Sequence, residues 1–186
     1  MRVIIVVILS LSCLFGCSSS HNGVSVALTL RDEMLKGNGH SFLAVVTADY
    51  GDRVYSFTMD CTAYPDGTVD FTIEEPASIS GICGRVSQSG GKLIFDDQVL
   101  LFDSLTSSQI TPAIAPYLMV KAIQGGYIRS TANSAETVDI NIDDTFRAET
   151  YQTVLALNNE GKPVTCEIFS NHRRILSIQV INFKPV

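Results

Sequence analysis

One serine lies in a sequence context that could support nucleophilic catalysis. Residues 39–43 are Gly-His-Ser-Phe-Leu, which is close to the G-x-S-x-G turn of serine hydrolases but lacks its second glycine. That turn also requires a strand before the serine and a helix after it, and the pattern around Ser41 predicts the reverse order. His172, the histidine that could act as its base, stands in a predicted turn beside Arg173. We therefore expect Ser41 to open a strand, and we expect no catalytic residues and no enzymatic activity.

Acidic residues suggest a second chemistry, the binding of a metal ion. Residues 139–144 (Asp-Ile-Asn-Ile-Asp-Asp) resemble the start of an EF-hand calcium loop, but Asp144 replaces its glycine and Thr150 replaces its bidentate glutamate. Strand alternation accounts for the same residues, and a calcium ion on Asp139, Asp143 and Asp144 stays open as the alternative. The three histidines stand far apart in the sequence, which disfavours a zinc site. We expect neither a resident metal nor a cofactor.

The composition limits the class of protein. The chain has 186 residues, of which 46% are hydrophobic, so it can bury the core of a single domain. Its 13 Lys and Arg against 19 Asp and Glu give a net charge of −6. Because binding to nucleic acid depends on clustered cations that displace phosphate counterions, we expect no nucleic-acid partner.

The N-terminal segment is typical of an export signal that ends in a lipid-attachment site. Arg2 precedes an apolar run from Val3 to Gly16, which is shorter than the ~20 residues of a membrane-spanning helix and has the length of a signal-peptide core. The run ends in Leu-Phe-Gly-Cys, which resembles the bacterial lipobox apart from the bulky Phe15. The resemblance implies cleavage before Cys17 and acylation of Cys17 with fatty acids such as palmitate. An ordinary secretory signal is the alternative.

These features predict the organisation of the chain. We expect a lipoprotein signal peptide over residues 1–16, a lipidated cysteine and flexible tether over 17–23, and a single domain over 24–186. Two or more acyl chains, each worth ~0.8 kcal/mol per buried CH₂, would hold the protein stably on a membrane. The expected location is the outer face of the bacterial cytoplasmic membrane, or the outer membrane if the cell has one.

The remaining cysteines allow one disulfide at most, because the processed chain would keep only Cys61, Cys83 and Cys166. Cys61 and Cys166 fall in the apolar phase of predicted strands, and we expect both to be buried. A bridge between Cys61 and Cys83 stays open, since connectivity cannot be deduced from the sequence.

Two segments have helical patterns. Residues 24–36 carry apolar side chains near helical spacing and stop at a Gly-Asn-Gly sequence. Residues 112–124 follow Thr111, a good N-cap residue, begin with Pro112 and end before two glycines. The second segment is apolar on most sides, so we expect it to be buried or to cover an apolar surface.

Most of the remaining chain alternates between apolar and polar residues, which predicts half-buried strands. The predicted strands lie at residues 41–49, 55–59, 69–73, 82–88, 92–95, 98–102, 127–131, 137–142, 150–157, 164–169 and 174–183. A Tyr-Pro-Asp-Gly sequence at 64–67 predicts a hairpin turn. Short loops imply an antiparallel meander whose apolar face the two helices must cover. The expected fold is therefore α+β, a strongly curved antiparallel sheet (an unclosed half-barrel) wrapped around two helices.

The order of these landmarks over residues 24–184 can be compared with known families. A helix comes first, a strand opens at Ser41, Gly67 stands in the hairpin turn, Phe-Thr-Ile-Glu-Glu-Pro follows at 71–76, and a proline-initiated helix precedes the last strands. This order resembles the LolA/LolB superfamily of lipoprotein carriers. The resemblance implies an unclosed antiparallel barrel whose mouth is plugged by helices and whose apolar interior binds acyl chains.

A ligand site in that interior would be lined by apolar residues of strands and of the second helix. The expected lining residues are Tyr55, Phe57, Met59, Phe71, Ile73, Tyr117, Leu118, Met119 and Ile123. The same residues would fill the core of a solid barrel, and two functions therefore stay open. In the first, the protein binds or shields a lipid or another apolar ligand, which a shift of the 112–124 helix admits. In the second, it is an anchored sensor or protein–protein interaction module with no ligand.

The lipobox resemblance predicts that Cys17→Ser blocks both acylation and cleavage, because the thiol is the group that carries the lipid. The wild-type protein should partition with membranes and begin with a modified Cys17, and the variant should accumulate as unmodified precursor. Mass spectrometry of the N-terminal peptide checks both masses. A mature wild-type chain with an unmodified N-terminus at another residue would contradict the prediction.

Overall fold

The computed structural model describes residues 20–96, 98–102, 111–144 and 151–186, so the predicted signal peptide and Cys17 lie outside the described residues. The helices are α2 (Ser20–Lys36), the 3₁₀ helix η2 (Pro112–Ile114) and α3 (Ala115–Gly125). The strands are β1 (His40–Asp49), β2 (Val54–Ala63), β3 (Val69–Glu75), β4 (Cys83–Ser87), β5 (Gly90–Phe95), β6 (Gln98–Phe102), β7 (Tyr127–Asn133), β8 (Thr137–Asp143), β9 (Gln152–Asn158), β10 (Pro163–Ser170) and β11 (Arg173–Pro185). Each predicted strand is present, with ends that differ by a few residues.

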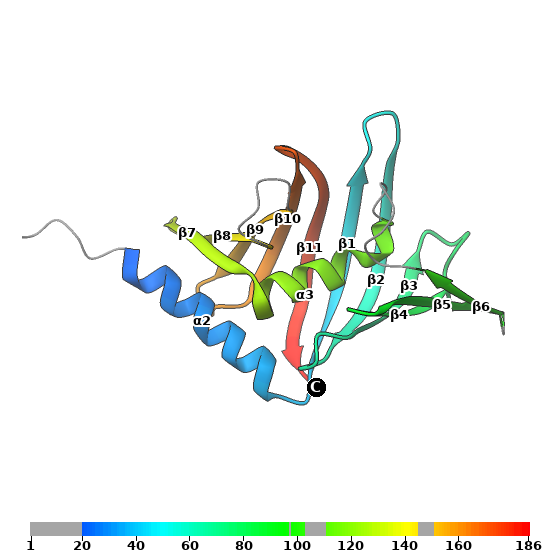
Figure 1. Cartoon of the computed structure of the whole chain (residues 1–186), viewed down its shortest axis with the longest axis horizontal. Coiled ribbons are helices and arrows are strands. Elements are labelled where there is room, and N and C mark those ends of the chain that lie inside the picture. Colours follow the sequence, from blue (N-terminus) through cyan, green and yellow to red (C-terminus); the bar gives the residue numbers. More distant parts are fainter. Residues whose placement is uncertain (1–19, 97, 103–110, 145–150) are drawn as a thin grey trace, which may run out of the picture.

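The strands form one curved antiparallel sheet that does not close on itself (Figure 1). Its order is β6-β5-β4-β3-β2-β1-β11-β10-β9-β8-β7. This confirms the α+β half-barrel. The prediction of a single meander is wrong, because β6 and β7 follow one another along the chain yet lie at opposite edges. Two meanders are instead joined at the centre, where β1 pairs with β11.

The predicted β2–β3 hairpin is present, and its turn follows from its sequence. The amide of Gly67 donates to the carbonyl of Tyr64 at 3.0 Å, and the amide of Thr68 donates to the side chain of Asp66 at 2.9 Å. Gly67 has φ +82°, a left-handed conformation that glycine adopts without a steric penalty. The Asp-Gly pair therefore fixes the turn locally, which explains why the sequence predicts it correctly.

Both predicted helices are present, but their starts differ from prediction. α2 begins at Ser20, so residues 20–23 of the predicted tether are helical. The second helix begins as a 3₁₀ turn at Pro112 and becomes α-helical at Ala115. Thr111 makes no side-chain cap hydrogen bond. Prolines in the first turns lack amide hydrogens, so they leave fewer donors for a cap to satisfy.

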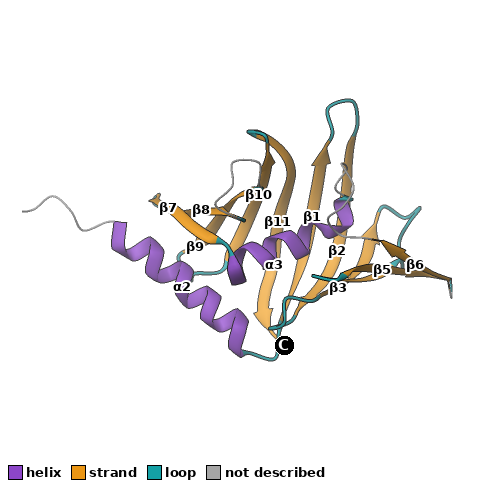
Figure 2. Ribbon diagram, viewed as in Figure 1, coloured by secondary structure: helices purple, strands orange, loops and turns teal. Residues whose placement is uncertain are grey.

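The two helices cover different parts of the concave face of the sheet (Figure 2). α3 crosses the centre and contacts β11, β2, β3 and β8, whereas α2 packs against β7, β8 and α3. Between them and the sheet lies one apolar core, which includes Met34 of α2, Met119 of α3 and Ile178 of β11. The wing formed by β4, β5 and β6 extends past the end of α3.

His40 is a buried polar residue at the start of β1. Its ring stacks on Phe183 with centroids 4.9 Å apart, and it is 4% exposed. Among the described residues, no hydrogen-bond partner lies within reach of its Nδ1 atom. Burial lowers the pKa of His40 from its ordinary value, and the charge of Glu33 raises it to a lesser extent.

This environment predicts a loss of stability in acid. The unfolded chain protonates His40 near its ordinary pKa of ~6.5, whereas the folded chain resists protonation, so the free energy of unfolding falls as the pH drops below that value. His40→Phe, which keeps the stacking and cannot titrate, should lose less stability than the wild type between pH 7.5 and pH 5. Urea unfolding at both pH values measures this difference.

His172→Asn is the control, since His172 is exposed and asparagine tolerates its φ of +62°. The control variant should follow the wild type. Equal losses in the wild type and in His40→Phe would show that His40 does not cause the acid sensitivity.

Candidate functional site

The structure brings most of the predicted ligand-lining residues together around α3, where they form packed core. Met59, Phe71, Ile73, Tyr117, Leu118, Met119 and Ile123 are buried, Phe57 is half-buried and Tyr55 is exposed. The space between α2 and the sheet, lined by Leu30, Ile123 and Leu155 among others, has a volume of about 10 Å³. A single water molecule needs at least ~10–15 Å³, so this space cannot hold an acyl chain.

Arg31 of α2 holds the end of α3 in place. Its guanidinium donates to the carbonyl of Ile123 at 2.7 Å through Nε and to the carbonyl of Gly126 at 2.6 Å through Nη2. The last carbonyls of a helix have no partner within the helix and carry its negative dipole end. Arg31 therefore satisfies them with a charge of the right sign and joins the two helices.

Three further contacts fix α3 on the sheet. Lys121 forms an ion pair with Asp144 at 2.9 Å, and the amide of Gln124 donates to the carbonyl of Tyr64 at 3.0 Å. A Cβ atom on Gly126 would lie 2.3 Å from Cγ2 of Ile142, so this glycine allows a close approach to β8. The helix shift considered as a route for ligand entry would have to break these contacts.

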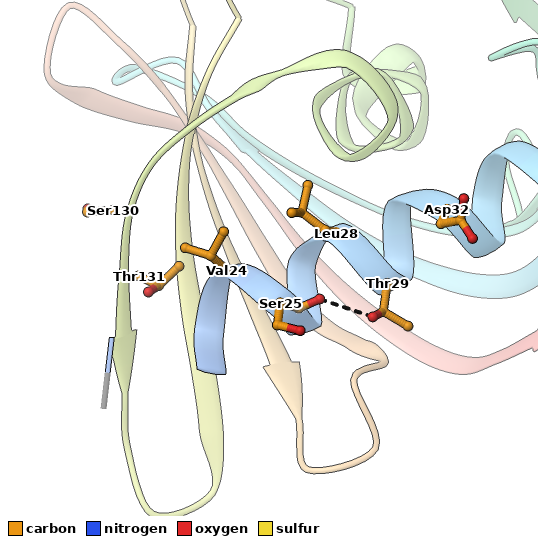
Figure 3. Close-up of a pocket in the computed structure, with 7 residues that line it drawn as sticks. All are labelled: Val24, Ser25, Leu28, Thr29, Asp32, Ser130 and Thr131. Carbon is orange, nitrogen blue, oxygen red and sulfur yellow. Dashed lines mark hydrogen bonds between the residues drawn. The ribbon is translucent and has the colours of Figure 1, made fainter. Parts of the chain in front are cut away.

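An open apolar groove lies elsewhere, between the N-terminal half of α2 and β7 (Figure 3). Its volume is about 870 Å³. Val24 and Leu28, one helical turn apart, supply the apolar surface and are 39% and 49% exposed. The polar residues of its lining are Ser25, Thr29, Asp32, Ser130 and Thr131. An apolar surface with a few polar groups at its margin is the usual composition of a small-molecule site.

A close contact between α2 and β7 sets one boundary of the groove. A Cβ atom on Gly23 would lie 2.7 Å from Cβ of Thr131, so a glycine is required where the helix meets the strand. In Figure 3, Val24 lies beside Thr131, and Leu28 projects from the same side of α2. The helix then leads away from this contact, with Asp32 at the far end of the lining.

The polar groups at the groove are only partly engaged with one another. The hydroxyl of Thr29 donates to the backbone carbonyl of Ser25 at 3.0 Å, and Asp32 pairs with Lys36 at 2.6 Å on the exposed side of α2. This ion pair is exposed and therefore weakly held. The lining thus offers hydroxyl groups and one carboxylate to the polar end of a ligand.

The two residues considered for nucleophilic catalysis, Ser41 and His172, lie far from each other in the structure. Ser41 pairs with Lys184 at one end of the β1–β11 ladder, and His172 precedes the other end, where Ala48 pairs with Leu176. Ser41 and Ala48 are seven positions apart along β1, a distance of ~23 Å, so Ser41 and His172 cannot form a catalytic pair.

Two acidic residues of the sequence that resembles an EF-hand loop face basic side chains, whereas Asp139 accepts a hydrogen bond from the hydroxyl of Thr137. Asp144 pairs with Lys121, and Asp143 lies 3.8 Å from Arg129. Among the described residues, no group of three or more His, Cys, Asp or Glu is placed to hold a metal ion. None of the helices in the same residues is long and apolar enough to cross a membrane.

The three described cysteines are free. Cys61 and Cys166 are buried as predicted, and burial raises the pKa of both thiols, which keeps them neutral. Cys83 is exposed on the opposite face of the sheet from Cys61, so the bridge left open between them is not formed.

Comparison with known proteins shows similarity only at the level of structure. No family model and no curated protein matches the sequence. A LolA superfamily protein from Nitrosomonas europaea is 9% identical, with a TM-score of 0.47 over 91% of this chain and 94% of that one. A putative outer membrane lipoprotein-sorting protein domain from Vibrio parahaemolyticus is 9% identical, with a TM-score of 0.48 over 90% and 93%. The Mycobacterium tuberculosis lipoprotein LppX is 9% identical, with a TM-score of 0.44 over 89% and 95%.

The Arg31 contacts predict a large effect of Arg31→Met on stability. The substitution leaves two carbonyls at the end of α3 without their charged donor, which should lower the free energy of unfolding by about 1–3 kcal/mol. Arg31→Lys keeps the charge but cannot donate to both carbonyls from a planar group, so its loss should be smaller. Lys36→Met is the control on the same helix and should change stability by less than about 1 kcal/mol. Urea unfolding tests the order, and equal losses at the two positions would refute it.

Proposed function

We propose that the protein is an extracytoplasmic bacterial lipoprotein, acylated on Cys17, that binds the apolar chain of a lipid in the groove between α2 and β7. The observation that carries the proposal is the groove itself, with exposed Val24 and Leu28 beside a polar margin. Burying a leucine-sized side chain stabilises a complex by ~1.5–3 kcal/mol, so a ligand that covers these two side chains gains affinity from their burial.

The position of the groove along the chain supports a role at a membrane surface. α2 begins three residues after Cys17, and the groove uses the first turns of that helix. Three extended residues span ~10 Å, so an anchor at Cys17 would keep the groove near the lipid headgroups. The membrane is then both the attachment site and the source of the ligand. In this proposal the protein is anchored to the outer face of the cytoplasmic membrane, or to the outer membrane in a cell that has one.

The protein acts in this proposal by binding alone, without catalysis. The apolar groove takes up one chain, and the hydroxyl groups of Ser25, Thr29 and Thr131 lie at its polar end. The packed interior under α3 serves as the scaffold that holds α2 against β7. The second function, an anchored protein-binding module, has its own structural support in the β5–β6 hairpin described below.

The proposal predicts that Leu28→Asp weakens lipid binding by about tenfold or more, because a charge replaces the apolar surface of the groove. Leu35→Asp is the matched control: Leu35 lies on the same helix, is similarly exposed and is outside the groove. Fluorescence titration with cis-parinaric acid measures the affinity, and thermal unfolding checks that both variants keep the fold. The wild type should bind saturably and Leu35→Asp should match it. No saturable binding, or an equal loss in both variants, would overturn the proposal.

A further inference from the structure

The β5–β6 hairpin carries a dense set of exposed apolar side chains. They are Ile94, Phe95, Val99, Leu100 and Leu101. Leu100 and Leu101 are consecutive in β6 and are 63% and 75% exposed. Single exposed apolar residues are common, but a contiguous group of this kind marks an interaction surface.

Apolar side chains lie on both faces of the hairpin, and one charged residue, Lys92, lies among them on the convex face, where it pairs with Leu101. Leu93 pairs with Leu100, and Leu93 also pairs with Gly84, which lies against the buried ring of Phe71 on the concave face. Ile94 pairs with Val99 on the convex face. The hairpin therefore lacks the alternation of a strand with one solvated face.

The outer edge of β6 is also unpaired within the sheet. β6 is the last strand on its side, so among the described residues no further strand faces the outward N–H and C=O groups of residues 98–102. Natural edge strands are protected by charged residues, prolines or bulges. β6 (Gln98–Phe102) has no charge and no proline, and its register with β5 is regular, whereas edge strand β7 contains Arg129 at a register shift.

The sequence around β6 is mainly acidic. Residues 90–110 include Asp96, Asp97 and Asp103 against one cation, Lys92, which pairs with Leu101 of β6. An apolar strand flanked by acidic residues is complementary to an apolar strand flanked by cations.

From these observations we infer that β6 is a docking site for an extended segment of a partner protein, which adds to the sheet as a twelfth strand. The segment has four or five consecutive apolar residues, because both faces of β6 are apolar, and it has Lys or Arg on each side. Its backbone pairs with the free edge of β6, and its side chains cover Val99, Leu100 and Leu101. This inference goes beyond the proposed lipid site and does not rest on it.

Two other occupants fit the hairpin less well. A second copy of β6 would bring its own aspartates toward those of the first, and opposed like charges destabilise paired strands. A membrane would leave the unpaired backbone groups of the edge in hydrocarbon, which is costly. The hairpin also lies at the opposite end of the long axis of the molecule from the start of α2, where the anchor attaches (Figure 1).

The test uses the processed protein purified from bacterial cells, held in phosphatidylcholine nanodiscs when it is acylated. The probe is a fluorescent peptide, Lys-Arg-Val-Leu-Val-Ile-Lys-Arg. Anisotropy should show saturable binding that weakens with added salt, and hydrogen exchange should slow at the amides of β6 when the peptide is present. Leu100→Asp should weaken binding by about tenfold or more. Val54→Asp is the matched control, since Val54 is 64% exposed at the start of β2, and it should bind like the wild type.

Two matched peptides test backbone pairing and charge complementarity separately. A peptide with proline at its centre should not bind, because proline removes a backbone donor and breaks strand pairing. A peptide with Glu in place of Lys and Arg should bind at least about tenfold more weakly. Equal binding by either peptide would overturn the inference. So would self-association that Leu100→Asp abolishes, or protection of the β6 amides by the nanodisc alone.

Discussion

The two α-helices in the described part of the chain cannot cover the concave face of an eleven-stranded open sheet from edge to edge, and the rest of the described structure follows from this shortage. α3 covers the centre, where β1 meets β11, and α2 covers the β7–β8 side. The wing beyond β3 has no described helix above it. It is held instead by Phe71 against Gly84 on the concave face and by the ion pair of Asp70 with Arg85 on the convex face. Apolar side chains consequently remain exposed where the helices end, at the groove beside α2 and along the β5–β6 hairpin.

The contacts that hold the helices also decide where a ligand can bind. Arg31 satisfies the end of α3, while Lys121 and Gln124 attach the same helix to the rest of the fold. α3 is fixed at several points, and its described apolar side chains, such as Met119 and Val120, are fully buried in packed core. The helix with open space beside it is α2, because a groove lies between its exposed Val24 and Leu28 and β7. Filling the half-barrel therefore moves the candidate site from the interior to its margin.

The sequence predicts the elements well because their signals are local. Alternation marks most of the strands, and the Asp66-Gly67 pair fixes the first hairpin. The pairing of β1 with β11 joins segments that are distant in the sequence, and no local pattern indicates it. The local patterns therefore predict a single meander, which is wrong. The expected lining residues fill the core because hollow and solid barrels use the same side chains. The sequence carries a weak signal for the groove, because Val24 and Leu28 form an apolar stripe beside the core stripe of α2. The signal for the β6 surface is stronger, because three apolar residues follow one another there.

The two exposed apolar surfaces differ in the chemistry that they leave unsatisfied. The groove offers side chains alone: an apolar surface with hydroxyl groups and one carboxylate, which suits a ligand with an apolar chain and a polar end. The β6 edge also offers backbone groups that face no other described strand, and an added polypeptide strand can pair with the whole row of them in place of water. Because the surfaces lie at opposite ends of the sheet, neither ligand would block the other (Figure 1). Under the proposed acylation of Cys17, the protein would hold a lipid near its attachment point while its far edge remains free to pair with a partner.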